Sequence, residues 1–308
     1  MTDTEFHVIL NANAGTANAT GVTAETLSQL FEANNLKATI DADGDRDLAD
    51  RIADAMASNA PTIVAAGGDG TITALAAALV GTERNLAILP LGTVNALAKD
   101  LSVPLNLPAA VAALATGQSH RIDVGEVNGR LFLHKVVVGL IPSLAAGREH
   151  IRGRQDASAK IGFLRYIFRR LERAKRIAVV IEPNEGARRV ERVQAIAVAS
   201  NAYDEGLGQF FSRNSLDRGT LTLYVLRHLT ARDFIRLTTG MLLGRWRNDE
   251  ALSMESVRSV SIDVRKSQLK VMFDGEVETL QTPLRFTIRP RALSVIVPAT
   301  AVVPAEAA

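Results

Sequence analysis

The chain of 308 residues contains no cysteine. This absence excludes disulfide bonds and thiolate-bound metal clusters, so its chemistry has to rest on oxygen and nitrogen groups. The histidines, His7, His120, His134, His150 and His228, lack the spacing of zinc ligands. We therefore expect no zinc site, and a reducing cytoplasm suits this composition.

Long apolar runs and a strong charge of one sign are also absent. No window reaches the roughly 20 uninterrupted apolar residues that a membrane span needs, and the nearest, Ala292 to Ala305, contains two prolines. The first residues, MTDTE, lack the basic and apolar regions of a secretory signal. The net charge of +2 is too small for general nucleic-acid binding. We predict a cytoplasmic protein with no transmembrane segment and no nucleic-acid partner.

Hydrophobic residues make up 47% of the chain, and its length suits two domains. The first third alternates strand-like runs with helix-like periodicity, which predicts parallel strands joined by crossover helices. The segments are His7 to Asn11, Thr23 to Asn34, Lys37 to Asp41, Asp47 to Ala57, Thr62 to Ala66, Ile72 to Val80 and Leu86 to Leu89.

After Arg121 the pattern changes to β-branched runs separated by turn residues, which predicts a mainly antiparallel β domain. We therefore predict an α/β domain over 1–121 and a β-rich domain over 122–290. The predicted strands are Leu131 to Val138, Ile177 to Ile181, Ala195 to Ser200, Leu221 to Leu226, Val257 to Val264 and Leu269 to Phe273, and the predicted helices are Lys160 to Arg176 and Ala231 to Arg245.

The strongest local signal is a buried strand, Thr62 to Ala66, that runs into Gly67-Gly68-Asp69-Gly70-Thr71 and then into a helix. Glycines let the backbone approach a phosphate closely, and the free amides at the start of a helix favour anionic oxygen. A plain strand-to-helix turn needs one glycine rather than three around an aspartate. The motif therefore predicts a phosphate site, with Asp69 suited to a magnesium ion that bridges carboxylate and phosphate.

Two further loops follow strands of the same domain. Leu91-Gly92-Thr93-Val94-Asn95 comes after Leu86 to Leu89, and Asn11-Ala12-Asn13-Ala14-Gly15 comes after the first strand. In a doubly wound sheet, ligands bind at the carboxyl ends of the strands. Three such loops at successive strand ends therefore predict one nucleotide site.

These motifs resemble the catalytic domain of the diacylglycerol kinase family, which includes bacterial lipid kinases and sphingosine kinases. The resemblance also rests on Asp123-Val124-Gly125, Ser200-Asn201 and Asp274-Gly275-Glu276, and it spans most of the chain in the right order. The Gly67 to Thr71 motif is shared with NAD kinases and phosphofructokinases, whereas the Leu91 to Asn95 loop is more specific to lipid kinases.

The resemblance implies an ATP-binding α/β domain of the NAD-kinase and phosphofructokinase type and a β-sandwich domain that binds lipid. It also implies that the segment from about 291 to 308 is a candidate to return to the first domain. The residues that it assigns to ATP and Mg²⁺ are Asn11, Asn13, Gly15, Gly67, Gly68, Asp69, Gly70, Thr71, Gly92, Thr93, Asn95 and Asp123.

The catalytic carboxylate is assigned by the same resemblance to the Asp274-Gly275-Glu276 turn. Among relatives this turn takes the proton from the lipid hydroxyl, so we expect Glu276 to be the general base, with Asp274 as the close alternative. Asp69 acts in catalysis through its magnesium. From the residue pattern alone, a plain hairpin turn stays open for Asp274 to Glu276.

The chain departs from the family pattern at three positions. Ala12 stands where many members carry proline, and Ala96 replaces a frequent aspartate, which leaves Asp69 and Asp123 as the acidic members of the magnesium network. Arg218 stands where an aspartate that binds a structural magnesium is expected, and a guanidinium cannot ligate a cation. Asp217 is the remaining candidate ligand there. An ion pair of Arg218 in place of the metal is the alternative that we favour.

Residues 148–176 carry ten cations against three carboxylates, a net charge of +7, beside apolar residues at helical spacing. Such a basic amphipathic helix suits anionic lipid headgroups, and a solvated face of a core helix is the alternative. We predict peripheral association with an anionic membrane that carries the lipid substrate. The oligomeric state stays open, a homodimer included.

The predicted activity is transfer of the γ-phosphoryl group of ATP to a lipid hydroxyl such as that of diacylglycerol, with Mg²⁺. An NAD-kinase-like enzyme is one alternative, and the Leu91 to Asn95 loop argues against it. A catalytically inactive lipid or nucleotide sensor is the other alternative. The departures at Ala96 and Arg218 favour the sensor, whereas the presence of Asp69 and Glu276 argues against it.

Overall fold

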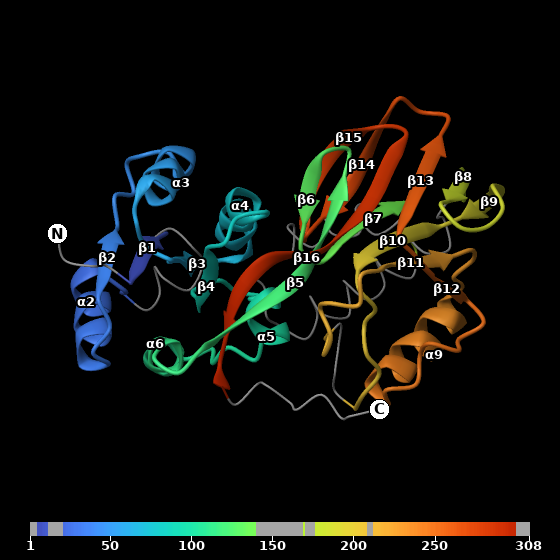
Figure 1. Ribbon diagram of the computed structural model, residues 1–308. Coiled ribbons are helices and arrows are strands. Elements are labelled where there is room, and N and C mark those ends of the chain that lie inside the picture. The colour runs from blue at the N-terminus through green and yellow to red at the C-terminus, as the bar shows by residue number, and fades with distance from the viewer. Residues whose placement is uncertain (1–4, 12–20, 140–168, 170–175, 208–211, 300–308) are drawn as a thin grey trace. The chain divides into compact units, whose positions relative to one another are not determined.

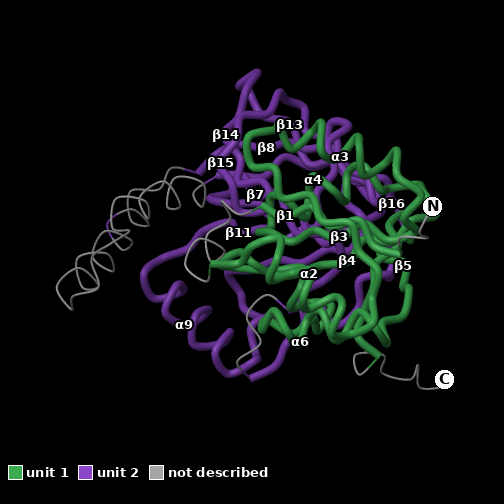
Figure 2. The backbone as a smooth tube through the Cα atoms, turned by 90° about the vertical axis from the view of Figure 1, so that its left-hand side faces the viewer, with its two compact units in different colours: residues 1–123, 291–308 green, residues 124–290 purple. Residues whose placement is uncertain are grey.

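The computed structural model, drawn as a ribbon in Figure 1, describes residues 5–11, 21–139, 169, 176–207 and 212–299. The chain forms two compact units, residues 1–123 with 291–308 (unit 1) and residues 124–290 (unit 2), which Figure 2 shows in different colours. It passes from unit 1 into unit 2 within β5 (Gln118–Val127) and returns within β16 (Leu284–Val297). None of the described helices is long and apolar enough to span a bilayer.

Unit 1 is built on a parallel sheet in the order β2-β1-β3-β4-β16. β1 and β3 are buried at every residue, as is typical of central strands in a sheet with helices on both faces. The predicted α/β fold with a mostly parallel sheet is confirmed. Its elements are β1 (Phe6–Leu10), α2 (Ala24–Ala33), β2 (Ala38–Asp41), α3 (Leu48–Ala57), β3 (Thr62–Gly67), α4 (Asp69–Leu79), β4 (Asn85–Pro90), α5 (Ala96–Asp100) and α6 (Leu107–Leu114).

A buried arginine fixes the carboxyl ends of two neighbouring strands of unit 1. Arg51 of α3 is 4% exposed, and its guanidinium donates to the carboxylate of Asp41 at 2.8 Å, to the carbonyl of Asp41 at 2.7 Å and to the carbonyl of Leu10 at 2.9 Å. Burial opposes ionisation of Asp41, but the bond from Arg51 holds the pKa of this carboxyl below its ordinary value. The end of β1, just before Asn11, is therefore held in place by a buried ion pair.

Unit 2 is an antiparallel β-sandwich, as predicted. One sheet has the order β12-β11-β10-β7-β14-β15, and the other joins the unit 2 part of β16 to β13, β8 and β9, with β5 and β6 beside it. The elements of unit 2 are β6 (Arg130–Phe132), β7 (Lys135–Gly139), β8 (Ile177–Pro183), β9 (Arg189–Val193), β10 (Ala195–Ser200), β11 (Leu221–Leu226), α9 (Ala231–Leu242), β12 (Leu252–Val257), β13 (Ser259–Val264), β14 (Gln268–Phe273) and β15 (Glu276–Gln281).

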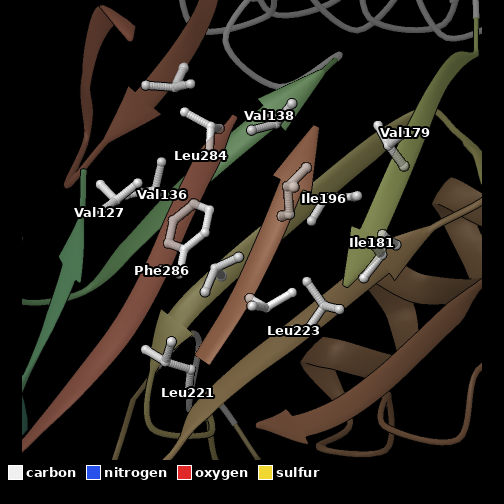
Figure 3. Packing of buried hydrophobic residues seen from close by; sticks show 14 of the residues in the cluster. Val127, Val136, Val138, Val179, Ile181, Ile196, Leu221, Leu223, Leu284 and Phe286 are labelled. Carbon is white, nitrogen blue, oxygen red and sulfur yellow. The ribbon is translucent and has the colours of Figure 1, made fainter. Parts of the chain in front are cut away.

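Side chains from both sheets form the core of unit 2, part of which is shown in Figure 3. Phe132 lies at its centre, with ring centroids 6.3 Å from Phe273 and 6.2 Å from Phe286 in edge-to-face geometry. A Cβ at Gly125 would lie 2.3 Å from the Phe132 ring. Glycine is therefore required at this position because the ring fills the space in which a side chain would lie.

Two predicted strands of unit 2 are each divided in the structure. Val257 to Val264 contains the end of β12 and all of β13, which belong to different sheets. The N–H groups of Arg258, between the strands, and of Ser259, the first residue of β13, donate to the side chain of Asn184. Leu131 to Val138 is divided between β6 and β7 because the intervening N–H groups bind a side chain, as described below. Of the predicted helix Lys160 to Arg176, only Arg169 and Arg176 lie among the described residues.

Candidate active site

The three predicted loops of unit 1 leave the same edge of the parallel sheet. Leu10 of β1 lies beside Ala66 of β3, and Gly67 lies beside Pro90 of β4. The backbone N–H of Asn11 donates to Ala66 at 2.9 Å, and that of Leu91 donates to Gly67 at 3.0 Å. The carboxyl ends of β1, β3 and β4 are therefore in register, and the residues that follow them are neighbours.

Asp69 joins the second loop to the third. One of its carboxylate oxygens accepts the N–H of Asn95 at 3.0 Å, and the other accepts the N–H of Ala96 at 2.7 Å. Asp69 is the first residue of α4, Ala96 is the first residue of α5, and Asn95 has a left-handed backbone with φ of 52°. The carboxylate therefore lies against the amino ends of two helices, where their exposed N–H groups favour negative charge.

Close approach of the two loops explains their glycines. A Cβ at Gly92 would lie 2.7 Å from the Cα of Gly68 and 2.8 Å from Oδ1 of Asn95, closer than real Cβ atoms approach. The same oxygen of Asn95 accepts the Gly92 N–H at 2.9 Å, and the Asn95 amide returns a bond to the Gly92 carbonyl at 2.8 Å. A Cβ at Gly67 would lie 2.7 Å from Oγ1 of Thr71. A larger residue at Gly92 would therefore push the two loops apart, and one at Gly67 would displace the side chain of Thr71 in its own loop.

The first loop is connected to the second through Asn11, whose side-chain amide donates to Oγ1 of Thr71 at 3.0 Å. Gly70 and Thr93 are exposed beside these buried contacts, so a ligand can reach them. The structure thus brings together most of the residues predicted for the nucleotide. Asn13 and Gly15 lie outside the described residues, as does Ala12.

Asp123 has a different position from the loops. It is 3% exposed, and its carboxylate accepts the N–H of Arg291 at 2.8 Å, where the returning chain re-enters unit 1 with a left-handed φ of 48° at Arg291. This bond connects the two chain crossings, β5 and β16. Whether Asp123 also acts on a metal stays a prediction.

In unit 2, Asp274 and Gly275 form the two-residue turn between β14 and β15. Both have positive φ, 45° and 106°, the geometry that favours an Asp-Gly pair in a tight hairpin. The Asp274 carboxylate also accepts the N–H groups of Leu133 at 2.7 Å, His134 at 2.9 Å and Lys135 at 2.9 Å. Burial raises the pKa of Asp274 although these three bonds oppose the rise. A plain hairpin turn would not require such a side chain.

Glu276, by contrast, is exposed at the start of β15 and makes no hydrogen bond or ion pair with the residues that the structure describes. The two carboxylates of the turn therefore differ in surroundings. Asp274 accepts bonds from backbone N–H groups, whereas Glu276 has no such contact among the described residues.

No motif in the sequence points to Arg213, which contacts the same segment as Asp274, namely Leu133 and His134. Its guanidinium is 1% exposed and donates to the carbonyls of Leu133 at 2.7 Å and Ser200 at 2.8 Å, and to Nδ1 of His134 at 3.0 Å. Arginine only donates, so Nδ1 is the acceptor and the imidazole is neutral. Burial and the nearby cations hold the pKa of His134 well below its ordinary value, which keeps it in that form.

At the predicted structural magnesium site, the side chains of two arginines lie near the carboxylate of Asp204. Arg218 lies 3.6 Å and Arg247 3.5 Å from the carboxylate of Asp204, which also accepts the N–H of Asn214. Asp217 accepts a bond from Ser215 at 3.0 Å. Within the described part of the chain, no group of three or more His, Asp or Glu residues is arranged to hold a metal.

Comparison with known proteins agrees with this organisation. Residues 5–127 match the model of the diacylglycerol kinase catalytic domain, and residues 145–297 match the YegS C-terminal NAD kinase beta sandwich-like domain. A "Probable lipid kinase YegS-like" of Pseudomonas aeruginosa is 32% identical over 257 residues, 80% of each chain. Its counterpart in Pseudomonas fluorescens is 29% identical over 251 residues, 80% of this chain and 81% of the relative.

The fold has solved counterparts as well. A crystal structure described as a diacylglycerol kinase from Bacillus anthracis superimposes with a TM-score of 0.67 at 20% identity, over 98% of this chain and all of the other. Fold, loop geometry and family models together define a kinase of the diacylglycerol kinase catalytic-domain family, to which this chain belongs. Within that family, the chain is similar to the YegS-like proteins of Pseudomonas.

Proposed function

We propose that the chain transfers the γ-phosphoryl group of ATP to the hydroxyl of a lipid such as diacylglycerol. The observation that carries this proposal is the set of bonds around Asp69, which holds two glycine loops together at the amino ends of α4 and α5. Backbone N–H groups at the amino end of a helix such as α4 bind phosphate oxygens, whereas the N–H groups of Asn95 and Ala96 at α5 are already bonded to Asp69. The names of the Pseudomonas relatives support a lipid as the acceptor.

ATP is bound in this proposal by the loops of unit 1. Gly67, Gly68, Gly70 and Gly92 allow the backbone to approach the phosphates, and the hydroxyls of Thr71 and Thr93 supply further polar contacts, with Asn11 and Asn95 shaping the loops. Asn13 and Gly15 complete the first loop. Together these residues position the γ-phosphate and balance its charge.

Mg²⁺ fits the residues present, with Asp69 as its protein ligand. Each carboxylate oxygen accepts one N–H and retains a second lone pair, and Mg²⁺ is commonly held by one or two carboxylates with substrate phosphates and water. The ion would neutralise charge on the transferred phosphoryl group. Asp123 is the second candidate. At the site where Asp217 is the candidate ligand, we propose that the arginines near Asp204, Arg218 and Arg247, replace a structural metal.

The proton of the lipid hydroxyl goes to Glu276, which is exposed and unengaged, while Asp274 fixes the turn. The hydroxyl oxygen forms a bond to the γ-phosphorus as the bond to the β,γ-bridging oxygen breaks, and ADP leaves. A positioned base contributes roughly 10²- to 10⁴-fold to such a rate. We propose that this chemistry occurs at a membrane surface, where the diacyl substrate resides.

The test is incubation with γ-labelled ATP, Mg²⁺ and mixed vesicles that contain diacylglycerol, followed by separation of the lipid and aqueous products. We expect label in phosphatidic acid and loss of this label in Glu276→Gln. Parallel reactions contain a total lipid extract or NAD. Label in another lipid would correct the substrate, label only in NADP would replace the proposed function by that of an NAD kinase, and ATP binding without any labelled product would indicate a sensor.

A further inference from the structure

α9 is unusual among the described helices because it has two apolar faces. Phe234, Leu237 and Met241 form one face, which packs in a cluster with Tyr224 and Trp246. Ile235, Leu242 and Leu243 lie on the other side and are 56%, 51% and 57% exposed. Figure 1 shows α9 beside β11 and β12, which supply the surface under the buried face. Packing within unit 2 explains one face and leaves the other in water.

The exposed residues form a continuous stripe. Positions 235, 239, 242 and 243 follow the i, i+4, i+7, i+8 spacing of one helix side, and the polar member of this set is Thr239. Its hydroxyl donates to the carbonyl of Ile235 at 2.8 Å, and the adjacent Thr238 hydroxyl donates to Phe234 at 2.7 Å. Because both hydroxyls are already bonded within the helix, moving this face out of water loses little hydrogen bonding.

A further apolar side chain lies at the end of the stripe. A Cβ at Gly244 would lie 2.6 Å from the backbone of Gly206, so the loop that carries Leu207 touches the carboxyl end of α9. Leu207 is 80% exposed. Four of the eight large hydrophobic residues that are exposed in the described part of the chain therefore belong to α9 and this loop. We call Leu207, Ile235, Leu242 and Leu243 the α9 patch.

Charge around the α9 patch distinguishes among partners. Arg232 and Arg245 are exposed at the two ends of the helix and make no hydrogen bond or ion pair through their side chains with the described residues. Arg236 is neutralised by Asp233 at 3.1 Å and Asp249 at 2.8 Å. Two exposed carboxylates, Glu205 and Glu250, lie near the carboxyl end of the helix, and Glu205 accepts the N–H groups of Trp246 and Arg247. Arginines beside an apolar helix face, whose threonine hydroxyls are already hydrogen-bonded within the helix, suit an anionic membrane surface.

We propose that the α9 patch docks the protein on an anionic lipid bilayer, with the patch in the acyl boundary and Arg232 and Arg245 at the headgroups. The inference deepens the proposed function, since a membrane-resident substrate requires a contact with the bilayer. It rests on residues other than the basic segment 148–176, most of which lies outside the described residues. Figure 2 shows α9 at the periphery of unit 2.

The test measures vesicle binding without ATP, so that its outcome does not depend on kinase activity. Wild type, the triple variant Ile235→Ser/Leu242→Ser/Leu243→Ser and the control Val190→Ser are sedimented with phosphatidylglycerol vesicles. Val190 is 67% exposed on β9, so the control removes a similar exposed side chain elsewhere in unit 2. We expect the triple variant to lose about 100-fold in partition coefficient, roughly fivefold for each side chain, and the control to bind as wild type.

A second variant, Arg232→Gln/Arg245→Gln, keeps the test valid if the triple variant fails to fold, as judged by its melting temperature. It should lose about 25-fold on phosphatidylglycerol, roughly fivefold for each charge, and be unchanged on phosphatidylcholine. Equal binding by wild type and both variants, or no binding by wild type, overturns the proposal. So does a dimer that the triple variant converts to a monomer, since the patch would then join two copies. Lipid phosphorylation is assayed separately and decides the proposed function.

Discussion

The substitution Asp69→Asn distinguishes two roles of the Asp69 carboxylate, as a ligand for magnesium and as a hydrogen-bond acceptor that holds two loops together. The sequence motif predicts that Asp69 is a ligand for magnesium, and in the structure its two carboxylate oxygens accept the N–H groups of Asn95 and Ala96. An amide offers one oxygen only. Whichever way it is oriented, its NH₂ group faces one of these two N–H donors. The substitution should therefore destabilise the protein even when ATP and Mg²⁺ are absent.

The magnitude follows from what is lost. A hydrogen bond to a charged acceptor contributes about 1.5–3 kcal/mol, and a backbone N–H left without an acceptor adds a cost of about 1–3 kcal/mol if it is sealed from water. The favourable charge at the amino end of α4 adds about 0.3–1 kcal/mol. Because Asp69 is half-buried, we expect a total of about 2–4 kcal/mol. With an unfolding entropy of about 2.1 cal/mol/K per residue, this lowers the Tm of a chain of 308 residues by roughly 3–6 °C.

The assay is thermal melting of the ligand-free protein with Asp47→Asn as the matched control. Asp47 also precedes a helix, α3, but makes no side-chain cap hydrogen bond, so the control removes a similar charge without removing a bond. We expect its Tm to change by about 1 °C. If Asp69→Asn melts together with the control and wild type, the carboxylate does not hold the loops, and any loss of activity has to come from the metal.

Three further predictions follow from the described contacts. Glu276→Gln should lower kcat by about 10²- to 10⁴-fold and leave the Kd for ATP and the Tm unchanged. Asp274→Asn should lower both kcat and Tm. If Glu276→Gln keeps full activity and Asp274→Asn is inactive, the base is Asp274. Asp41→Asn should cost about 3 kcal/mol at pH 7 by leaving Arg51 buried without its counter-charge. Folding lowers the pKa of Asp41, so the stability that its carboxylate contributes is present above the unfolded pKa and is lost as pH falls through the lower folded pKa. Denaturation of wild type and Asp41→Asn between pH 7 and pH 3 checks this. A stability difference between the two proteins that does not change with pH contradicts it. EDTA in the absence of ATP should leave the Tm unchanged, because Arg218 lies beside Asp204 in place of a metal. If EDTA lowers the Tm and added Mg²⁺ restores it, this interpretation is wrong.

The fold was predictable where hydrophobic periodicity decides it. The buried strands Thr62 to Ala66 and Leu86 to Leu89 and the amphipathic helix from Ala231 agree with β3, β4 and α9. The strands β9 and β15 were missed because their apolar residues do not alternate regularly with polar ones and each strand buries a single residue. The division of Leu131 to Val138 also escaped prediction, since no local pattern shows that its N–H groups bind Asp274, about 140 residues away.

In the candidate site too, residues that belong to a local sequence pattern were predictable, and residues whose partners are distant in sequence were not. Glycine loops are readable because glycines that follow a strand are a local signal. In the structure Gly67 lies against the side chain of Thr71, and Gly92 lies against the backbone of Gly68. Arg213 was not readable, since its acceptors, Leu133 and Ser200, are adjacent only after the strands pair. Position 96 is instructive as well. Alanine has no carboxylate for a metal, yet its backbone N–H is the group that Asp69 requires.

A common physical reason makes Asp69 and Asp274 difficult to interpret by activity alone. In each, both carboxylate oxygens accept backbone N–H groups from another segment, and these bonds shape the loop that carries the proposed chemistry. Loss of activity on substitution of either residue would follow from a displaced loop as well as from a lost ligand or base. Glu276 has no such contacts among the described residues, so a fall in kcat at constant Tm in Glu276→Gln can be attributed to proton transfer itself.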